Sequence, residues 1–408
     1  MSQLLPVVLL TALLLSTSSA RGEFIDSVHV RGARRTRDET ISTLLPRPPP
    51  ANYERAELDD FARRLGNLAI FDDVKVTLHG ATLDVTVREK WTLIPELALG
   101  TGKTAADLSL DIGATEYNVL GLGTELGATL YRKERGLGFV AWLSEHSYRL
   151  SRWSRGASLE YTNVSSRFDD GQTFRTVGPR VSGWLKSPPV VSRFLRYQLA
   201  VRYQREDVRD AQGGAAAPSG HGMLLGAGLS YDRYHWHDLV PRGGKLSVNL
   251  GPGFFMPSAQ PRHFLDFEAK AALPLVHQAV LALRVKAALC SRGNPNASST
   301  LGSVEGVRGL PDALYRNWAQ VFVNVELRQA VRLLERVALQ AVLFADVAEF
   351  QRMTAAGKRG EQVFAASLGA GARVLPTFLA QAALRVDLAR LLAPRAGWLP
   401  QLGLTQYF

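Results

Sequence analysis

The sequence predicts a mainly β protein, with an antiparallel transmembrane β-barrel of about 16 strands that follows one small α+β domain. Three observations support this fold class. The chain begins with an export signal, residues 95–408 consist of short segments that alternate apolar and polar residues, and no apolar stretch of 18 uncharged residues follows the signal. The absence of such a stretch argues against a helical membrane protein, whereas barrel strands alternate and escape a hydropathy search.

Residues 1–20 are predicted to be a secretory signal peptide that is cut after Ala20. They contain no charged side chain, the run from Leu4 to Leu15 is apolar, and Ser18 supplies a small residue at position −3. The alternative is a single membrane helix, which needs about 20 apolar residues. The apolar run has only 12, and the signal peptide is therefore favoured.

The charge balance of the chain is basic. It carries 48 Lys and Arg against 37 Asp and Glu, a formal net charge of +11. Because the basic residues are spread along the chain without a dense cluster, we predict no nucleic-acid partner. The excess indicates a charged lumen or a collar near anionic lipid. Cys290 is the only cysteine, so no intrachain disulfide can form, and we interpret it as a small hydrophobic residue at a strand end.

Residues 24–89 are predicted to form the small domain, in the order strand, helix, helix, strand, strand. The segment from Phe24 to Val30 is the first strand. Thr36 and Glu39 have the spacing of a capping box. They predict a short helix that ends near Leu45.

The second helix and the last two strands of this domain follow from hydrophobic periodicity. Asn52 can cap the helix, whose apolar residues recur at helical spacing: Leu58, Phe61, Leu65 and Leu68. The two strands lie on either side of a turn at residues 79–81 and alternate with period two. Their apolar residues are Val74, Val76 and Leu78, then Leu83, Val85 and Val87.

From about residue 95 the alternating segments continue to the end of the chain. They include residues 246–250, 265–272, 281–288 and 321–328, each with one apolar face and one largely polar or charged face. A water-soluble β-sandwich has the same alternation with its apolar face inward, and a membrane barrel has it reversed. Export and the lack of a helical block to cover a sheet favour the barrel.

The end of the chain also favours the barrel. Leu402, Leu404 and the terminal Phe408 alternate with other residues, and this pattern resembles the recognition signal on the last strand of bacterial outer-membrane barrels. At roughly 20 residues for each strand with its connection, residues 91–408 have room for about 16 strands. An even number is what single-chain bacterial barrels require.

Several motifs occur in order along the chain. Residues 24–89 have the element order of a polypeptide-transport-associated (POTRA) domain, and residues 65–74 and 83–89 are similar to its helix-to-strand signature and its final strand. Residues 116–123 and 231–244 are similar to a first barrel hairpin and a mid-barrel turn. With a single POTRA-like domain, the mature chain resembles the outer-membrane assembly and two-partner-secretion superfamily, whose members place POTRA domains before a 16-stranded barrel.

The most specific motif of this resemblance is Val307-Arg308-Gly309-Leu310. It resembles the tip of a long extracellular loop that folds back into the lumen, although the family usually has an aromatic residue where this chain has Leu310. Asp346 resembles the strand acid that meets the loop arginine, and Asp387 is a second candidate. The resemblance implies that the guanidinium of Arg308 binds these carboxylates and pins the loop to the wall. The alternative is that Arg308 is a solvated loop residue.

The resemblance implies a protein that inserts or translocates other proteins at the bacterial outer membrane. Its N-terminal domain would lie in the periplasm and receive extended clients by β-augmentation; the alternative is a passive plug or spacer. The expected partners are unfolded or partly folded client proteins, outer-membrane lipids, and periplasmic chaperones or accessory proteins. Two other functions stay open: a dedicated exporter of one secreted partner, and a porin-like channel.

No motif indicates an enzyme. The sequence contains neither a Gly-x-Ser-x-Gly elbow nor a His-Glu-x-x-His site, and we predict no catalytic residue, no cofactor and no metal. His235 and His237 are two residues apart, which would place both on one face of a strand. We interpret them as loop or lumen residues, with a metal site as the alternative.

Overall fold

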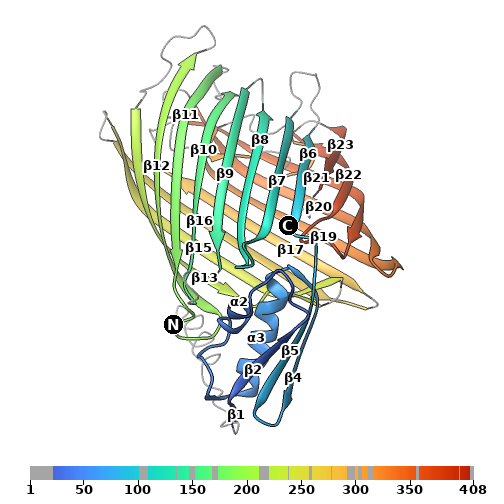
Figure 1. Cartoon of the computed structure of the whole chain (residues 1–408). Coiled ribbons are helices and arrows are strands. Elements are labelled where there is room, and N and C mark those ends of the chain that lie inside the picture. Colours follow the sequence, from blue (N-terminus) through green and yellow to red (C-terminus); the bar gives the residue numbers. More distant parts are fainter. Residues whose placement is uncertain are drawn as a thin grey trace, which may run out of the picture.

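In a computed structural model of the chain, a small N-terminal region lies at one end of a large β-barrel (Figure 1). The structure describes residues 22–100, 109–133, 136–146, 152–167, 173–210, 220–237, 239–256, 260–276, 278–291, 299–301, 306–310, 316–354, 358–394 and 396–404. The predicted signal peptide, residues 1–20, and the terminal Phe408 lie outside the described residues. No helix within the described ranges is both long and apolar enough to cross a membrane.

The N-terminal region, residues 22–90, contains two small sheets and two helices. Its elements are β1 (Glu23–Ile25), β2 (Ser27–Arg31), α2 (Asp38–Ser42), β3 (Ala51–Tyr53), α3 (Arg55–Asn67), β4 (Phe71–His79) and β5 (Thr82–Glu89). β1 pairs with β3, and a three-stranded sheet has the order β2-β5-β4. β2 runs parallel to the central β5, and β4 runs antiparallel to it.

The core of this region confirms the predicted periodicities. The four apolar residues of the second helical segment, Leu58, Phe61, Leu65 and Leu68, are 0–9% exposed. They pack in one cluster with Leu83, Val85 and Val87 of β5. An amphipathic helix of 13 residues gains most of its stability from such packing and little from its own propensity.

Three local expectations were wrong. The segment from Phe24 to Val30 forms two strands in different sheets. Thr36 does not cap the first helix, because Arg37 holds the N-cap position and the hydroxyl of Thr36 accepts a hydrogen bond from Asn118 of the barrel. Asn52 lies within β3. Glu54 precedes the second helix, and its backbone N–H donates to the carboxylate of Glu57 at 2.9 Å.

The barrel is closed and antiparallel, and among the described residues it has 16 long strands, as the strand-length estimate predicted. They are β6 (Leu93–Gly100), β7 (Ser109–Val119), β8 (Thr124–Lys133), β9 (Gly136–Glu145), β10 (Ser154–Arg167), β11 (Thr173–Lys186), β12 (Leu195–Asp210), β13 (Gly220–Asp232), β15 (Val240–Met256), β16 (Gln260–Pro274), β17 (Ala279–Cys290), β19 (Arg316–Leu334), β20 (Val337–Met353), β21 (Arg359–Pro376), β22 (Leu384–Ala393) and β23 (Gly397–Gly403). Two short strands, β14 (His235–His237) and β18 (Ser299–Thr300), pair with β15 and β19.

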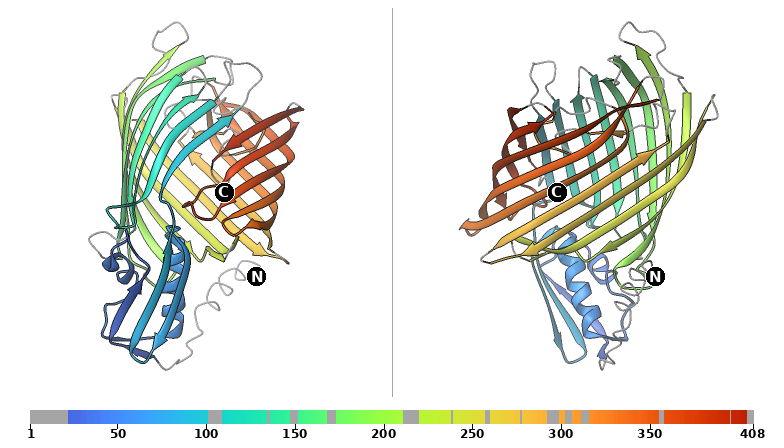
Figure 2. Two further views of the ribbon diagram at one scale, coloured as in Figure 1. Left: turned by 45° about the vertical axis from the view of Figure 1, so that its right-hand side comes forward. Right: turned by 180° about the vertical axis from the view of Figure 1, so that it is seen from behind.

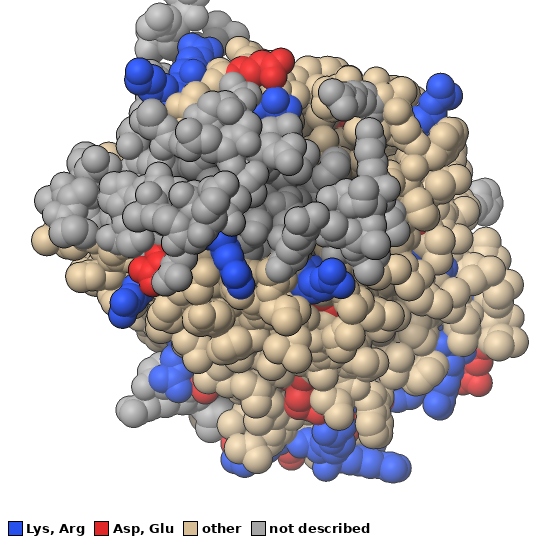
Figure 3. Space-filling model, turned by 90° about the horizontal axis from the view of Figure 1, so that it is seen from above, with Lys and Arg blue, Asp and Glu red and all other residues tan. Residues whose placement is uncertain are grey.

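The alternating segments turn their apolar face outward. On β19, Val321 and Leu327 are 39% and 42% exposed, whereas Glu326 and Arg328 are fully buried inside. This orientation is that of a membrane barrel and the reverse of a soluble sandwich. Seen from the end away from the N-terminal region, the visible described surface is mostly uncharged, with scattered Lys and Arg side chains (Figure 3).

The barrel closes through a short seam between its first and last strands. Among the described residues, β23 pairs with β6 at three positions, Gly100–Gln401, Leu99–Leu402 and Ala98–Gly403, and the backbone N–H of Leu404 donates to Leu97 at 2.9 Å. On its other side β6 pairs with β7 at eight positions. Figure 2 shows these terminal strands, cyan and dark red, facing one another. β6 therefore has fewer paired positions with β23, across the seam, than with β7.

The N-terminal region is joined to the barrel by a turn of the β7–β8 hairpin. The carbonyl oxygen of Gly121 accepts hydrogen bonds from the backbone N–H of Arg37 at 3.0 Å and from the hydroxyl of Thr40 at 2.9 Å. Trp91 exchanges backbone hydrogen bonds with Phe378 and Ala380 after β21. At a third place, the side chain of Asn67 in α3 donates to the carbonyl oxygen of Tyr234 at 2.7 Å. The N-terminal region and the residue that follows it thus contact several separate parts of the barrel.

Gly121→Ala is expected to loosen this attachment. Gly121 has φ +75°, and a Cβ there would lie 2.2 Å from the carbonyl oxygen of Arg35. We expect faster hydrogen exchange at the amide of Arg37. Gly80→Ala is the matched control, because Gly80 has φ +61° with nothing within 4 Å of an added Cβ. It carries only the backbone strain of about 1–2 kcal/mol. Equal exchange at Arg37 in both variants would contradict the role of Gly121.

The loop that meets this turn is held by Glu89. Its carboxylate accepts the backbone N–H of Thr36 at 2.7 Å and that of Arg35 at 3.1 Å. Partial burial raises the pKa of Glu89, but the hydrogen bonds from Thr36 and from neighbouring backbone N–H groups lower it more, and the net pKa lies below its ordinary value. An ionised Glu89 therefore stabilises the folded loop.

Acidification is expected to release this loop. A carboxylate whose pKa is lower in the folded state contributes stability above its unfolded pKa of about 4.3, and that stability is lost as the pH falls through the folded value. Amide exchange at Arg35 and Thr36, corrected for the intrinsic rate, should accelerate over that acidic range. Glu89→Gln should show weaker protection with no dependence on pH there; a variant that keeps the same pH dependence would assign the effect to another group.

Candidate functional site

The described part of the loop before β19, residues 306–310, is buried inside the barrel. All five residues are buried, and Arg308 and Val307 are completely inaccessible. Gly309 has φ +87°, a conformation that favours glycine, and the N–H of Leu310 donates to the carbonyl of Val307 at 3.1 Å. The tight turn places the side chain of Arg308 against the inner wall.

Arg308 and Asp346 form a bidentate pair. The Nε and Nη2 atoms of Arg308 each lie 2.8 Å from an oxygen of Asp346 on β20, and the backbone N–H of Arg308 donates to the same carboxylate at 3.1 Å. Asn324 on β19 donates to Asp346 at 2.9 Å and to the loop carbonyl of Gly306 at 2.7 Å. Side chain and backbone of the loop are therefore both fixed to the wall.

Glu326 on β19 lies at the centre of the cluster. Its carboxylate accepts hydrogen bonds from three arginines: Arg308 at 2.6 Å, Arg328 at 2.6 Å and Arg373 of β21 at 2.8 Å. Glu326, Arg308 and Arg373 are 0% exposed. Because a buried charge is tolerated when it is paired and hydrogen-bonded, each member depends on the others.

Asp387 on β22 adds a third carboxylate. It lies 3.6 Å from Arg308 and 3.6 Å from Arg385, within ion-pair range but beyond hydrogen-bond length. The residue is completely buried. Gly371 of β21 makes room for it, since a Cβ on Gly371 would lie 1.9 Å from an oxygen of Asp387. We refer to these four arginines and three carboxylates as the lumen cluster: Arg308, Arg328, Arg373, Arg385, Glu326, Asp346 and Asp387. The lumen cluster joins the loop to four consecutive strands, β19, β20, β21 and β22.

An aromatic ring and apolar side chains enclose the lumen cluster. The guanidinium carbon of Arg308 lies 3.5 Å from the ring centroid of Phe344, a cation–π contact. Gly369 accommodates that ring, because a Cβ there would lie 2.2 Å from it. Val307 and Leu310 pack with buried apolar side chains of β19 to β22. Water is excluded on several sides, and the ionic contacts are stronger for it.

Sequence reasoning named Arg308, Asp346 and Asp387, and the structure brings all three together. It missed Glu326, Arg328 and Arg373. A signal for the first two was present, since Asn324, Glu326 and Arg328 occupy alternate positions that share the inward face of β19. What the sequence could not supply was the register, in which Asn324 pairs with Asp346 across β19 and β20.

The other predicted residues are not members of the lumen cluster. Leu402 lies on β23 and Leu404 directly follows that strand. The imidazole of His235 lies 3.1 Å from the carbonyl oxygen of Arg233, and the described residues contain no group of three His, Cys, Asp or Glu that could hold a metal. Cys290 ends β17, and its thiol donates to the carbonyl of Trp318 at 3.4 Å.

The arrangement of charges in the lumen cluster fits a structural role. It lacks the pairing of a nucleophile with a base, and its carboxylates are occupied by arginines. Removal of one partner from a buried ion pair leaves an uncompensated charge and destabilises by roughly 3–5 kcal/mol. The geometry therefore fits a latch that keeps the loop inside the barrel and cross-links one side of the wall.

Comparisons with known proteins relate this fold to three solved barrels. No family model and no curated protein matches the chain. A crystal structure of BamA from Haemophilus ducreyi that lacks POTRA domains 1–3 matches with 15% identity and a TM-score of 0.53, over 95% of this chain and 85% of that one. CdiB from Acinetobacter baumannii matches with 13% identity and 0.63, over 94% and 74%. CdiB from Escherichia coli matches with 13% identity and 0.68, over 94% and 76%. The chain shares the fold of these proteins.

Proposed function

We propose that this chain lies in the bacterial outer membrane and inserts or translocates other proteins there, with residues 24–89 as a single POTRA domain in the periplasm. The observation that carries the proposal is the shared architecture: the BamA and CdiB barrels match over 94–95% of the chain, N-terminal region included. The outward apolar face and the buried polar lumen cluster support a membrane location. The proposal assigns no catalytic residue and no cofactor.

The N-terminal sheet supplies a means of capturing clients. In its order β2-β5-β4 the two outer strands are β2 and β4, and among the described residues neither pairs with another strand on its outer side. An extended client can add to such an edge through backbone hydrogen bonds, which make little demand on its sequence. We propose that unfolded or partly folded clients, delivered by chaperones or accessory proteins, dock there first.

The second part of the proposal is that the barrel opens at the seam between β6 and β23. The lumen cluster cross-links β19 to β22, whereas the seam between β6 and β23 has three paired positions. A structure under strain separates where the fewest contacts hold it, so we propose that clients reach the membrane through this seam. The latch would then keep intact the wall from β19 to β22, which adjoins the seam through β23.

The first test is the outer-membrane proteome after depletion of this protein, quantified against the wild type. Loss of several unrelated barrels supports a general insertase. Loss of one surface or secreted protein indicates a dedicated exporter. An unchanged proteome together with altered uptake of small solutes would overturn the proposal and leave a porin-like channel.

Locking the seam is expected to block the activity. In a Cys290→Ser background the chain has no thiol, and Leu99→Cys/Leu402→Cys then places two thiols at a paired position of the seam. Oxidation should lower the levels of client barrels, and a reductant should restore them. The matched control is Leu97→Cys/Ile112→Cys, a paired position of β6 and β7. Normal client levels with a locked seam would argue against lateral opening.

A further inference from the structure

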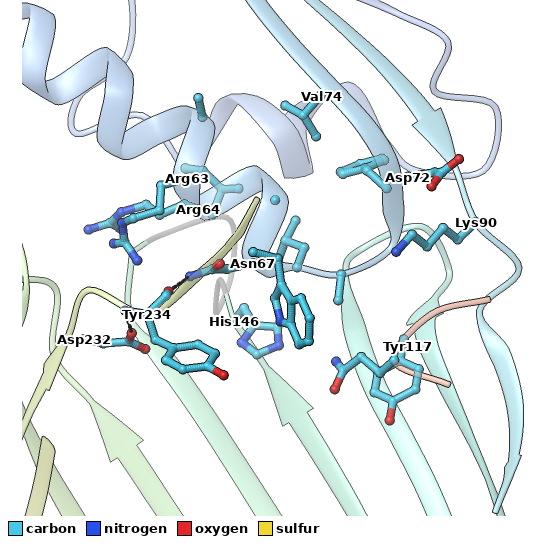
Figure 4. A pocket seen from close by; sticks show the side chains of 18 of the residues that line it. Arg63, Arg64, Asn67, Asp72, Val74, Lys90, Tyr117, His146, Asp232 and Tyr234 are labelled. Carbon is cyan, nitrogen blue, oxygen red and sulfur yellow. Dashed lines mark hydrogen bonds between the residues drawn. The ribbon is translucent and has the colours of Figure 1, made fainter. Parts of the chain in front are cut away.

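A large cavity separates the N-terminal region from the barrel mouth. Its volume is about 1160 Å³. Its walls are the C-terminal half of α3, the start of β4, and the inward faces of barrel strands at the end that meets the N-terminal region. Figure 4 shows Arg63, Arg64, Lys90 and Asp232 around this space. We refer to this cavity as the vestibule.

The vestibule has a strong excess of positive charge. Among the described residues that line it are eleven Lys and Arg against three Asp. Some of these cations are neutralised locally: Arg63 and Arg64 pair with Asp60 at 2.8 and 2.7 Å, and Arg88 pairs with Asp72. On the barrel side of the vestibule, seven of the described lining residues are Lys or Arg and one, Asp232, is acidic. In the part of the chain that the structure describes, no carboxylate forms a salt bridge with Lys186 or Lys245.

The register of the barrel strands places some of these cations directly opposite one another. Lys245 of β15 pairs with Lys270 of β16, which in turn pairs with Arg284 of β17. Like charges at opposed positions destabilise a sheet. Glu268 relieves one side of this row, at 2.8 Å from Arg284 and 3.6 Å from Lys270. An arrangement that costs stability in the free protein points to an anion that binds there.

The size and position of the vestibule favour a polypeptide as that anion. Pockets for small molecules measure roughly 300–1,000 Å³, and this one is larger. It lies on the inward side of the strands, whereas the acyl chains of a lipid would contact their outward face. Aromatic side chains lie between the cations. The ammonium nitrogen of Lys186 lies 5.0 Å from a ring centroid of Trp184, and the guanidinium carbon of Arg63 lies 5.4 Å from the ring centroid of Phe194. Such rings can pack against an extended chain.

We propose that the vestibule binds an acidic, extended polypeptide segment on its way from the N-terminal region to the barrel. Lys186, Arg196 and Lys245 bind its carboxylates from the barrel side, and Lys90 faces them from the N-terminal side. This inference rests on the proposed function, because the segment is taken to belong to a client. One-signed charge in a confined cleft concentrates oppositely charged ligands and speeds their entry.

The test is direct binding to the full chain in detergent micelles. The probes are three fluorescently labelled peptides of equal length, in which Ser alternates with Asp, with Lys or with Asn. Fluorescence anisotropy should show binding of the Asp peptide, weakening with salt because charge attraction is screened. Equal affinity for the Asp and Asn peptides would overturn the proposal.

Two variants locate the binding. Lys186→Gln/Lys245→Gln should weaken binding of the Asp peptide by about tenfold or more, since each lost charge-assisted hydrogen bond accounts for a factor of that order. Arg55→Gln/Lys358→Gln removes the same charge from exposed positions outside the vestibule and should leave the affinity unchanged. Asp232→Asn removes one lining carboxylate and should strengthen binding. Equal losses in both double variants would place the binding elsewhere.

The remaining outcomes separate this inference from the proposed function. If glycerol phosphate displaces the Asp peptide at a similar concentration, the vestibule is a site for phosphate or lipid headgroups and the polypeptide assignment is wrong. If the Asp peptide binds as expected but depletion leaves the outer-membrane proteome unchanged, the acidic-segment site stands and the client role fails. If depletion removes unrelated barrels but the peptide does not bind, the proposed function stands and this inference fails.

Discussion

Arg308→Ala is expected to lower the free energy of unfolding of the barrel by about 3–5 kcal/mol. The substitution removes the guanidinium that binds Asp346 in a bidentate pair at 2.8 Å and contacts Glu326 at 2.6 Å. Asp346 would keep its bond to Asn324 but lose its charge partner in a fully buried position. The measurement is the temperature at which the folded band is lost on a semi-native gel, because folded barrels migrate differently from unfolded chains.

Two comparisons test this explanation. Arg308→Lys retains the charge but cannot form the planar two-pronged contact, so an intermediate loss is expected. Lys358→Ala removes an exposed cation near the start of β21 and should change the transition little. If Arg308→Ala unfolds at the wild-type temperature and supports normal client levels in cells, the loop latch has no role in the barrel.

Glu326→Gln is expected to destabilise the barrel at least as much as Arg308→Ala does. Four arginines and three carboxylates meet in the lumen cluster, and Glu326 alone contacts Arg308, Arg328 and Arg373. With a neutral amide at its centre, three buried cations repel one another across the interior, where charges are poorly screened. The same unfolding measurement applies, and Asp346→Asn should show a smaller loss because Asp346 pairs with one arginine.

The control for this prediction is Glu361→Gln. Glu361 forms an ion pair with Arg352 at 2.9 Å, but its side chain is 65% exposed. Exposed pairs contribute only about 0–1 kcal/mol. A double variant, Glu326→Gln/Arg373→Gln, should recover part of the stability because it removes one of the uncompensated cations. Absence of any recovery would mean that Glu326 acts through packing and not through charge.

We expect the loss of stability in these variants to affect function as well, because the lumen cluster holds one wall of the barrel together. If the latch holds β19 to β22 together, its loss lowers the resistance of the wall that adjoins the seam through β23. In cells, Arg308→Ala and Glu326→Gln should then reduce client levels at temperatures where the purified variants are still folded. A fall in client levels only when the variant itself disappears from the membrane would assign the lumen cluster to stability alone.

The sequence predicted which helices and strands form more accurately than it predicted the residues at which they begin and end. The helix of residues 55–67 followed from apolar residues at helical spacing, which packing enforces. Its start at Glu54 and the role of Thr36 were missed, because both depend on partners distant in sequence. Thr36 accepts from Asn118, 82 positions away, and this contact prevails over the local capping preference.

The sequence by itself determined a strand-rich chain, one apolar face on each strand and about 16 strands. Local patterns suffice for these, since alternation is a property of each strand alone. The pairing of Arg308 with Asp346 and Asp387 was an expectation that the family resemblance implied. Only the tertiary structure decided that Glu326 and Arg373 complete the lumen cluster and that Lys245 lies opposite Lys270. The physical reason is register: closure of the barrel sets which inward side chains meet, and a shift of one residue would turn every one of them outward.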